Sequence, residues 1–110
     1  MEINVNSNQQ FSINEEEFDP TSIRLNVIGR VDAINSDILD SRLNRALSEG
    51  HINIVVDMSA VRFLSSVGIR AVLKAFKEAK KRGGGLRIEE PSEIVRNVLG
   101  ITALDEMLGG

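Results

Sequence analysis

Hydrophobic and polar residues alternate with two different periods along this chain. A period of two over residues 11–14 and 23–28 predicts strands with one buried face, and the same alternation over residues 1–6 predicts an extra strand. The run Ile52-Asn53-Ile54-Val55-Val56 is almost wholly apolar, which predicts a short interior strand covered on both faces. Residues 86–89 form a further short strand.

Apolar residues at helical spacing predict helices between and after these strands. The first helix follows the cap-like sequence Asn35-Ser36-Asp37 and ends at Gly50. The second begins at Ser66 and ends at a triplet of glycines, and Ser92 caps a third. Residues 102–108 add one or two more helical turns. This order of elements predicts an α/β fold with a parallel sheet and an N-terminal hairpin.

Two of the predicted loops lie at the carboxyl ends of strands, where such sheets carry their functional residues. One loop follows Ile28 and contains Asp32, and the other follows Val56 and leads to Ser66. We therefore expect Asp32 and Ser66 to be neighbours in space despite their separation in sequence.

Two further polar features have a simple structural interpretation. Residues 15–19 form an acidic cluster before Pro20, which we interpret as a solvated loop at a hairpin turn rather than a partner-binding patch. His51 is the only histidine and follows Gly50 directly. Because the chain has no cysteine and no second histidine, we expect His51 to be a surface residue of a connection and not a metal ligand.

Composition narrows the possible functions. The 110 residues suit a single domain, and a net charge of −3 gives no electrostatic support to nucleic-acid binding. The absence of cysteine excludes disulfides, thiolate metal sites and cysteine nucleophiles. No apolar run approaches the ~20 residues that a membrane-spanning helix needs, so we expect a cytoplasmic protein without a membrane span.

The junction before the second helix carries two adjacent serines, Ser65 and Ser66. A hydroxyl at a helix N-terminus can cap free backbone N–H groups, and the same groups also favour an anion. This pattern is compatible with plain capping or with a site where negative charge is added and removed.

Three segments around these features resemble a known family. They are LNVIGRVDA at residues 25–33, IVVDMS at 54–59 and FLSSVGI at 63–69, and the late segment ITALD at 101–105 agrees with them. Over about residues 10–108 the sequence is similar to the STAS domain, and more narrowly to the bacterial anti-sigma-factor antagonists.

The resemblance implies both a fold and a mode of action. The fold would be one STAS-like domain over residues 1–110, α/β, with a mixed, largely parallel sheet of four to five strands and about four helices packed mainly on one face. In this family a serine at the start of the second helix is phosphorylated by a partner that is both a serine kinase and an anti-sigma factor. The unphosphorylated form binds that partner and frees the sigma factor, and a phosphatase restores it.

Ser66 occupies the position of the family's phosphorylated serine. Many members carry Asp where this chain has Ser65. This chain therefore has two adjacent hydroxyl groups at the site, and Ser65 is the alternative acceptor. Phosphate adds about −1.5 to −2 charges, which a helix N-terminus tolerates, so we expect the fold to survive and the partner to be repelled, with Asp32 and Asp57 adding like charge. The predicted partner-binding residues are Asp32, Asp57, Ser65, Val67, Gly68 and Arg70.

Two alternatives belong to other functional classes. One is a STAS scaffold that is never phosphorylated and serves in a stress-sensing or lipid-transport assembly. The other is an enzyme or nucleotide-binding protein, against which stand the lack of a Walker-type loop, of a dinucleotide fingerprint and of any paired His or Cys group. We expect no catalytic residue, metal or cofactor.

Overall fold

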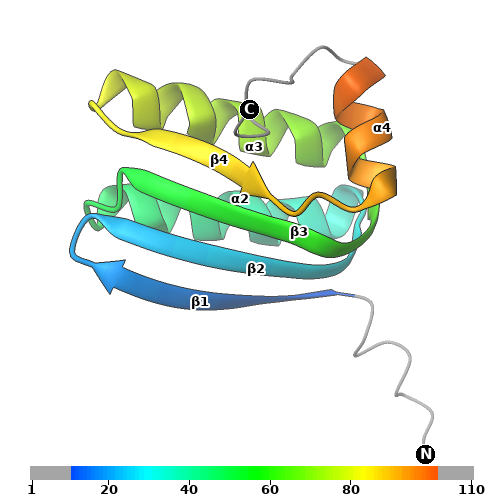
Figure 1. The fold of residues 1–110 in the computed structure, drawn as a ribbon, viewed down its shortest axis with the longest axis horizontal. Helices are drawn as coiled ribbons and strands as arrows, with labels where there is room; N and C mark the ends of the chain where they lie inside the picture. The colour runs from blue at the N-terminus through cyan, green and yellow to red at the C-terminus, as the bar shows by residue number, and fades with distance from the viewer. Residues whose placement is uncertain (1–10, 102–110) are drawn as a thin grey trace, which may run out of the picture.

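The computed structural model describes residues 11–101, which form four strands and three helices (Figure 1). Their order along the chain is β1 (Phe11–Asp19), β2 (Ser22–Val31), α2 (Ala33–Ser48), β3 (Asn53–Leu64), α3 (Ser66–Lys81), β4 (Gly85–Glu89) and α4 (Glu93–Ile101). The strand predicted over residues 1–6 and the helical turns predicted over 102–108 lie outside the described residues.

The strands make one mixed sheet in the order β1-β2-β3-β4. β1 and β2 form an antiparallel hairpin, whereas β2 pairs in parallel with β3 and β3 in parallel with β4. The predicted α/β class, with a largely parallel sheet and an N-terminal hairpin, is therefore confirmed.

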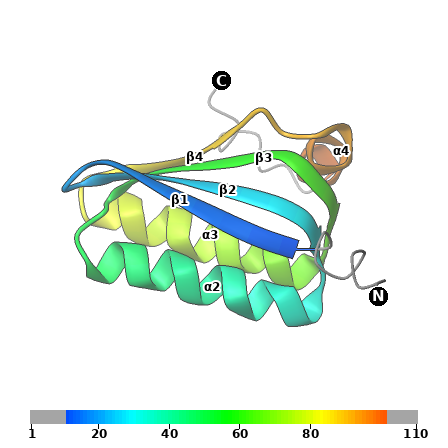
Figure 2. The same cartoon turned by 90° about the horizontal axis from the view of Figure 1, so that it is seen from below.

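One face of the sheet is covered by α2 and α3, which lie side by side (Figure 2). Alternate side chains of the central strands point into this layer, so the core lies between the sheet and the two helices. Its fully buried members include Leu25, Val27, Leu39, Leu43, Ile54, Val56 and Met58. The third helix, α4, lies away from α2 and α3, beside the carboxyl-terminal part of β3 (Figure 2).

The predicted strand over residues 52–56 was too short, since β3 continues to Leu64. Beyond Met58 the buried positions are Val61 and Leu64, at a spacing of three instead of two. The β2–β3 register shifts twice along this part, and such irregularities change which residue faces the core. The strand therefore continues beyond Met58, although its buried residues no longer follow a period of two. Val55 is half-buried, so the expectation of two covered faces is also wrong there.

The predicted start of the first helix was three residues late. Asp32 is the N-cap of α2, and its carboxylate accepts a hydrogen bond of 2.8 Å from the backbone N–H of Asn35. The predicted helix ends hold for α2 and α3. Gly50 and Gly83 follow them with φ of +95° and +93°, a conformation that glycine adopts without strain.

The acidic cluster and the histidine are more structured than expected. The cluster is not a loop, because residues 15–19 belong to β1, where Glu15 forms ion pairs with Arg42 and Arg45 of α2. His51 is buried, not on the surface, and its Nε2 lies 3.0 Å from Oε1 of Glu17. Two carboxylates of the cluster therefore have basic partners: Glu15 pairs with two arginines of α2, and Glu17 lies against His51.

No helix among residues 11–101 is long and apolar enough to cross a membrane.

Candidate functional site

The N-termini of α2 and α3 meet at one edge of the sheet. Val31 and Leu64 are paired at the ends of β2 and β3, and each is followed by a single cap residue and then by a helix. The backbone N–H of Ser65 donates to the carbonyl of Val31 over 2.9 Å. The expectation that Asp32 and Ser66 are neighbours is therefore confirmed, and we call this place the helix junction. The residues directly after Ile28 and Val56 are not loops as predicted, because β2 continues to Val31 and β3 to Leu64.

A chain of hydrogen bonds joins the two caps through Ser36. The buried Ser36 hydroxyl donates to the carbonyl oxygen of Asp32 over 2.6 Å and lies 3.2 Å from Oγ of Ser65. Since the single proton of Ser36 is used by Asp32, the Ser65 hydroxyl is the donor to Ser36. Oγ of Ser65 also accepts from the backbone N–H of Gly68 over 3.1 Å. Both functions of the Ser65 hydroxyl are thus occupied within the fold.

Ser66 has the opposite surroundings. It is the first residue of α3 and is exposed, and no hydrogen bond joins its hydroxyl to the residues that the structure describes. A hydroxyl group in this position is accessible to a modifying enzyme without disturbance of the cap.

Close packing holds the two helices together at this junction. A Cβ atom placed on Gly68 would lie 2.8 Å from Cγ1 of Val31 and 3.1 Å from Oγ of Ser36. The absence of a side chain at position 68 therefore lets the first turn of α3 approach the end of β2. Among the predicted partner-binding residues, Gly68 is buried, and what the structure supports for it is this packing role.

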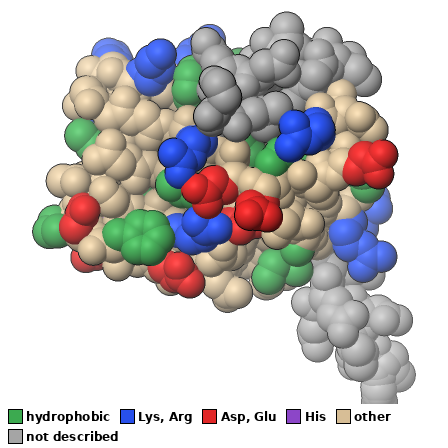
Figure 3. Space-filling view, viewed as in Figure 1, with side chains coloured by type: hydrophobic (Ala, Val, Ile, Leu, Met, Phe, Trp, Pro, Cys, Tyr) green, Lys and Arg blue, Asp and Glu red, His purple; other side chains and the backbone are tan. Residues whose placement is uncertain are grey.

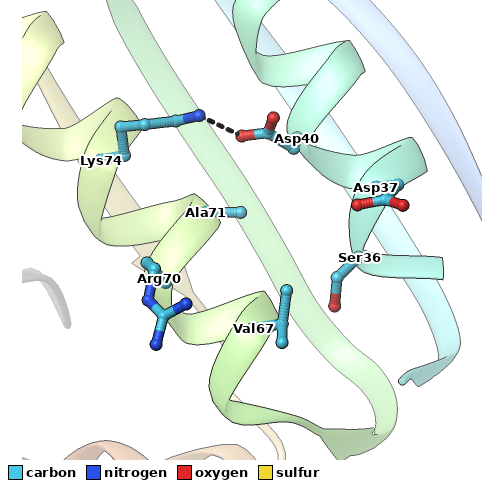
Figure 4. A pocket seen from close by; sticks show the side chains of 7 residues that line it. All are labelled: Ser36, Asp37, Asp40, Val67, Arg70, Ala71 and Lys74. Carbon is cyan, nitrogen blue, oxygen red and sulfur yellow. Dashed lines mark ion pairs between the residues drawn. The ribbon is translucent and has the colours of Figure 1, made fainter. Parts of the chain in front are cut away.

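A groove runs between α2 and α3 from the junction (Figure 4). Two of the predicted partner-binding residues, Val67 and Arg70, line it, and both are exposed. Farther along the groove Lys74 forms an ion pair of 2.8 Å with Asp40. The complete lining is Ser36, Asp37, Asp40, Val67, Arg70, Ala71 and Lys74.

Exposed apolar side chains stand in the first turns of both helices. Ile34 of α2 is 77% exposed, Ile38 one turn later is 44% exposed, and Val67 of α3 is 37% exposed. Helical spacing alone groups Ile38 with the apolar residues Leu39 and Leu43 of the same helix, but Ile38 is exposed. A signal was present, because the two isoleucines lie four apart and off the stripe that Leu39 and Leu43 define. Exposed isoleucines near the N-terminus of α2, the helix whose N-terminus meets that of α3, suit a surface that another protein covers.

Asp57 lies elsewhere. It is in the middle of β3, seven residues before Leu64, or roughly 20 Å along an extended strand. Its carboxylate accepts from Arg24 over 2.6 Å and from the backbone N–H and hydroxyl of Ser59 over 2.9 and 2.8 Å. The structure does not bring Asp57 to the helix junction.

Asp57 belongs to a group of ion pairs on the sheet face opposite α2 and α3. Arg24 bridges Asp57 and Glu89, both at 2.6 Å, and Glu89 is paired with Arg87 as well. Figure 3 shows acidic and basic side chains interleaved near the centre of this face. We call these four residues the open-face network.

The network alters the acidity of its carboxyl groups. Burial raises the pKa of Asp57, but hydrogen bonds from Ser59 and the Arg24 guanidinium outweigh it and hold this pKa below its ordinary value. The hydrogen bond from Arg24, followed by that from Arg87, lowers the pKa of Glu89. Near neutral pH these carboxylates are therefore negatively charged, and the neighbouring arginines balance that charge.

Within residues 11–101 there is no cluster of three or more His, Cys, Asp or Glu side chains that could hold a metal ion. What the helix junction offers chemically is an exposed hydroxyl, two capped helix N-termini and apolar surface.

Comparison with known proteins agrees with this architecture. The model of the STAS domain matches residues 13–109. The anti-sigma-B factor antagonist of Bacillus subtilis (strain 168) is 29% identical over 86 residues, which are 78% of each chain.

Two solved structures share the fold. The unphosphorylated form of the anti-sigma factor antagonist SpoIIAA has a TM-score of 0.79 at 20% identity, with 87% of this chain and 84% of that chain covered. The phosphorylated form of SpoIIAA, a Bacillus cell fate determinant, has a TM-score of 0.73 at 18% identity, with 87% of both chains covered.

Proposed function

The chain belongs to the STAS domain family, and within it we propose that this protein is an anti-sigma-factor antagonist switched by phosphorylation of Ser66. Its unphosphorylated form binds an anti-sigma factor, which releases the sigma factor. The relatives named as anti-sigma factor antagonists, one of them in a phosphorylated form, support this proposal. The protein acts as a regulator and not as an enzyme, in the cytoplasm, where sigma factors work.

The contrast between the two serines is the observation that carries the proposal. The Ser65 hydroxyl donates to Ser36 and accepts from Gly68, so phosphorylation there would break both contacts and remove the cap of α3. Ser66 is exposed and free of these duties. We therefore assign the phosphate to Ser66, and the role of Ser65 is to cap the helix that presents it.

The proposed partner surface consists of exposed residues near the N-termini of α2 and α3. Ile34, Ile38 and Val67 supply the apolar contact, and Asp32 and Arg70 supply charge at its border. A phosphate dianion inside a surface that a partner has dried loses its hydration without gaining a matching cation, which is costly. The switch changes partner affinity and leaves the fold intact.

Of the two carboxylates expected to add to the repulsion of the partner, Asp32 and Asp57, only Asp32 keeps this role in the proposal. Asp32 follows Val31 at the junction and remains a source of like charge close to the phosphate. Asp57 is neutralised by Arg24 and lies toward the middle of the sheet, so we give it no part in repelling the partner.

The direct test is phosphorylation by the cognate anti-sigma factor kinase with ATP, followed by mass spectrometry of the wild type, Ser65→Ala and Ser66→Ala. We expect phosphate on Ser66 in the wild type and in Ser65→Ala, and none in Ser66→Ala. Phosphate on Ser65 alone would show that Ser65, and not Ser66, is the phosphorylated residue. No phosphate from a kinase shown to be active on another substrate would favour the unphosphorylated scaffold.

A binding measurement tests the switch itself. Ser66→Asp should weaken binding of the anti-sigma factor by about 2 kcal/mol, roughly thirtyfold, whereas Ser66→Ala should bind like the wild type. Ser48→Asp places the same charge at the far end of α2 and serves as the control. Equal affinities of the two Ser66 variants would contradict the proposal.

A further inference from the structure

We propose that Arg70 holds the phosphoryl group of phosphorylated Ser66 through an ion pair across one turn of α3. The inference rests on the proposed function, because it concerns the state in which Ser66 carries phosphate. It assigns a phosphate-binding role to a side chain of this chain itself, separate from any contact with the partner.

The spacing of the two residues puts them on the same face of the helix. Ser66 is the first residue of α3 and Arg70 follows four positions later, and residues four apart on a helix have Cβ atoms about 5–6 Å apart. Both side chains are exposed. Figure 4 shows the guanidinium group of Arg70 directed toward the N-terminal end of α3, the end at which Ser66 lies.

Arg70 is also available, in contrast to its basic neighbours. Lys74, one turn farther along α3, is paired with Asp40 over 2.8 Å, and Arg82 is paired with Glu78 over 2.8 Å. Within residues 11–101 Arg70 makes no ion pair, although it lines the same groove as Asp37 and Asp40. An arginine without a carboxylate can accept a new anion without first breaking a bond.

The chemistry of the two groups matches. A guanidinium group presents parallel N–H donors that bind two oxygens of one phosphate, and such charge-assisted hydrogen bonds are stronger than neutral ones. A serine that carries phosphate supplies three acceptor oxygens and a second pKa of about 6. An arginine beside the phosphate favours the dianion, so it lowers that pKa.

The pair would give phosphorylation two effects at the junction. It adds negative charge at Ser66, and it withdraws the Arg70 guanidinium from the surface that the partner contacts. Arg70 therefore contacts the partner when Ser66 is unphosphorylated and binds the phosphate when Ser66 is phosphorylated.

The test installs phosphoserine at position 66 of the full chain during translation, so that no kinase is needed. The phosphate signal is then titrated by ³¹P NMR in the wild type, Arg70→Gln and Lys74→Gln. We expect the second pKa of the phosphate to be about 0.5 lower in the wild type than in Arg70→Gln. Lys74→Gln should titrate like the wild type, because Lys74 is engaged by Asp40.

The design separates this inference from the proposed function. Asp32, Asp37 and Asp40 of α2 contribute negative charge near the phosphate, but these residues and the Lys74–Asp40 ion pair are the same in the wild type and Arg70→Gln, so they cancel in that comparison. Equal pKa values in the wild type and Arg70→Gln would overturn the ion pair even if a kinase phosphorylates Ser66. Failure of a kinase to phosphorylate Ser66 would overturn the proposed function and would not move this titration.

Discussion

The helix junction and the open-face network are both polar regions on β2 and β3, yet they differ in how their groups are satisfied. In the network, Arg24 lies between Asp57 and Glu89, and each charge has an opposite charge within 2.6 Å. At the junction, Ser65 is engaged within the fold, whereas Ser66 beside it is exposed. A group already satisfied by its neighbours supports the fold, and a group left unsatisfied at the surface is available to another molecule.

The largest effect should come from charging the apolar surface at the junction. Ile34→Asp should weaken binding of the anti-sigma factor by about 2 kcal/mol or more, because exposed apolar residues at an interface centre carry much of its energy. Its thermal stability should stay close to that of the wild type. Phe18→Asp places the same charge on β1, where the wild-type ring is 59% exposed, and should leave affinity unchanged in the same titration calorimetry. Equal losses from both variants would mean that the surface is not specific.

The next effect is on stability and comes from opening the network. Arg24→Gln leaves Asp57, whose side chain is 17% exposed, without its cation and should lower the free energy of unfolding by about 1–2 kcal/mol in urea denaturation. Partner binding should not change. Lys74→Gln breaks a surface pair instead and should cost less than about 0.5 kcal/mol. A comparable loss in both variants would show that the network adds nothing beyond surface pairing.

A smaller difference should separate the two serines. Ser65→Ala removes the N-cap of α3 and should lower the free energy of unfolding by about 1 kcal/mol. Ser66→Ala removes an exposed hydroxyl and should stay within about 0.5 kcal/mol of the wild type. The reverse order in urea denaturation would contradict the capping role of Ser65.

The smallest effect is a pH dependence of the network. The pKa values of Asp57 and Glu89 lie below their ordinary values of 3.8 and 4.5, so their contribution to stability is present above those values. It is lost as the pH falls through the lower pKa of the folded state. Urea denaturation from about pH 6 to about pH 3 should therefore show a steeper loss in the wild type than in Arg24→Gln. Parallel curves would exclude Arg24 as a cause of the lowered pKa values.

Much of the fold was predictable because its signals are local. The helical stripe of α3, the glycines after α2 and α3, and the alternation in β2 each depend on a few adjacent residues, and all correspond to observed elements. The length of β3 was not predictable in this way. Its second half pairs with β2 through register shifts, so its buried residues follow the neighbouring strand instead of a period of two.

The candidate site was likewise predictable only in the features that depend on adjacent residues. The amino-acid order alone located the serine pair at a helix start and placed Asp32 at the carboxyl edge of the same sheet. It could not separate Ser65 from Ser66, because the group that engages Ser65 is Ser36, which belongs to another helix. Nor could it show that Asp57 is neutralised, because Arg24 reaches it from the neighbouring strand. Local pattern determines where helices and strands begin, whereas the partner of a polar side chain depends on which distant segments the fold brings within hydrogen-bonding distance.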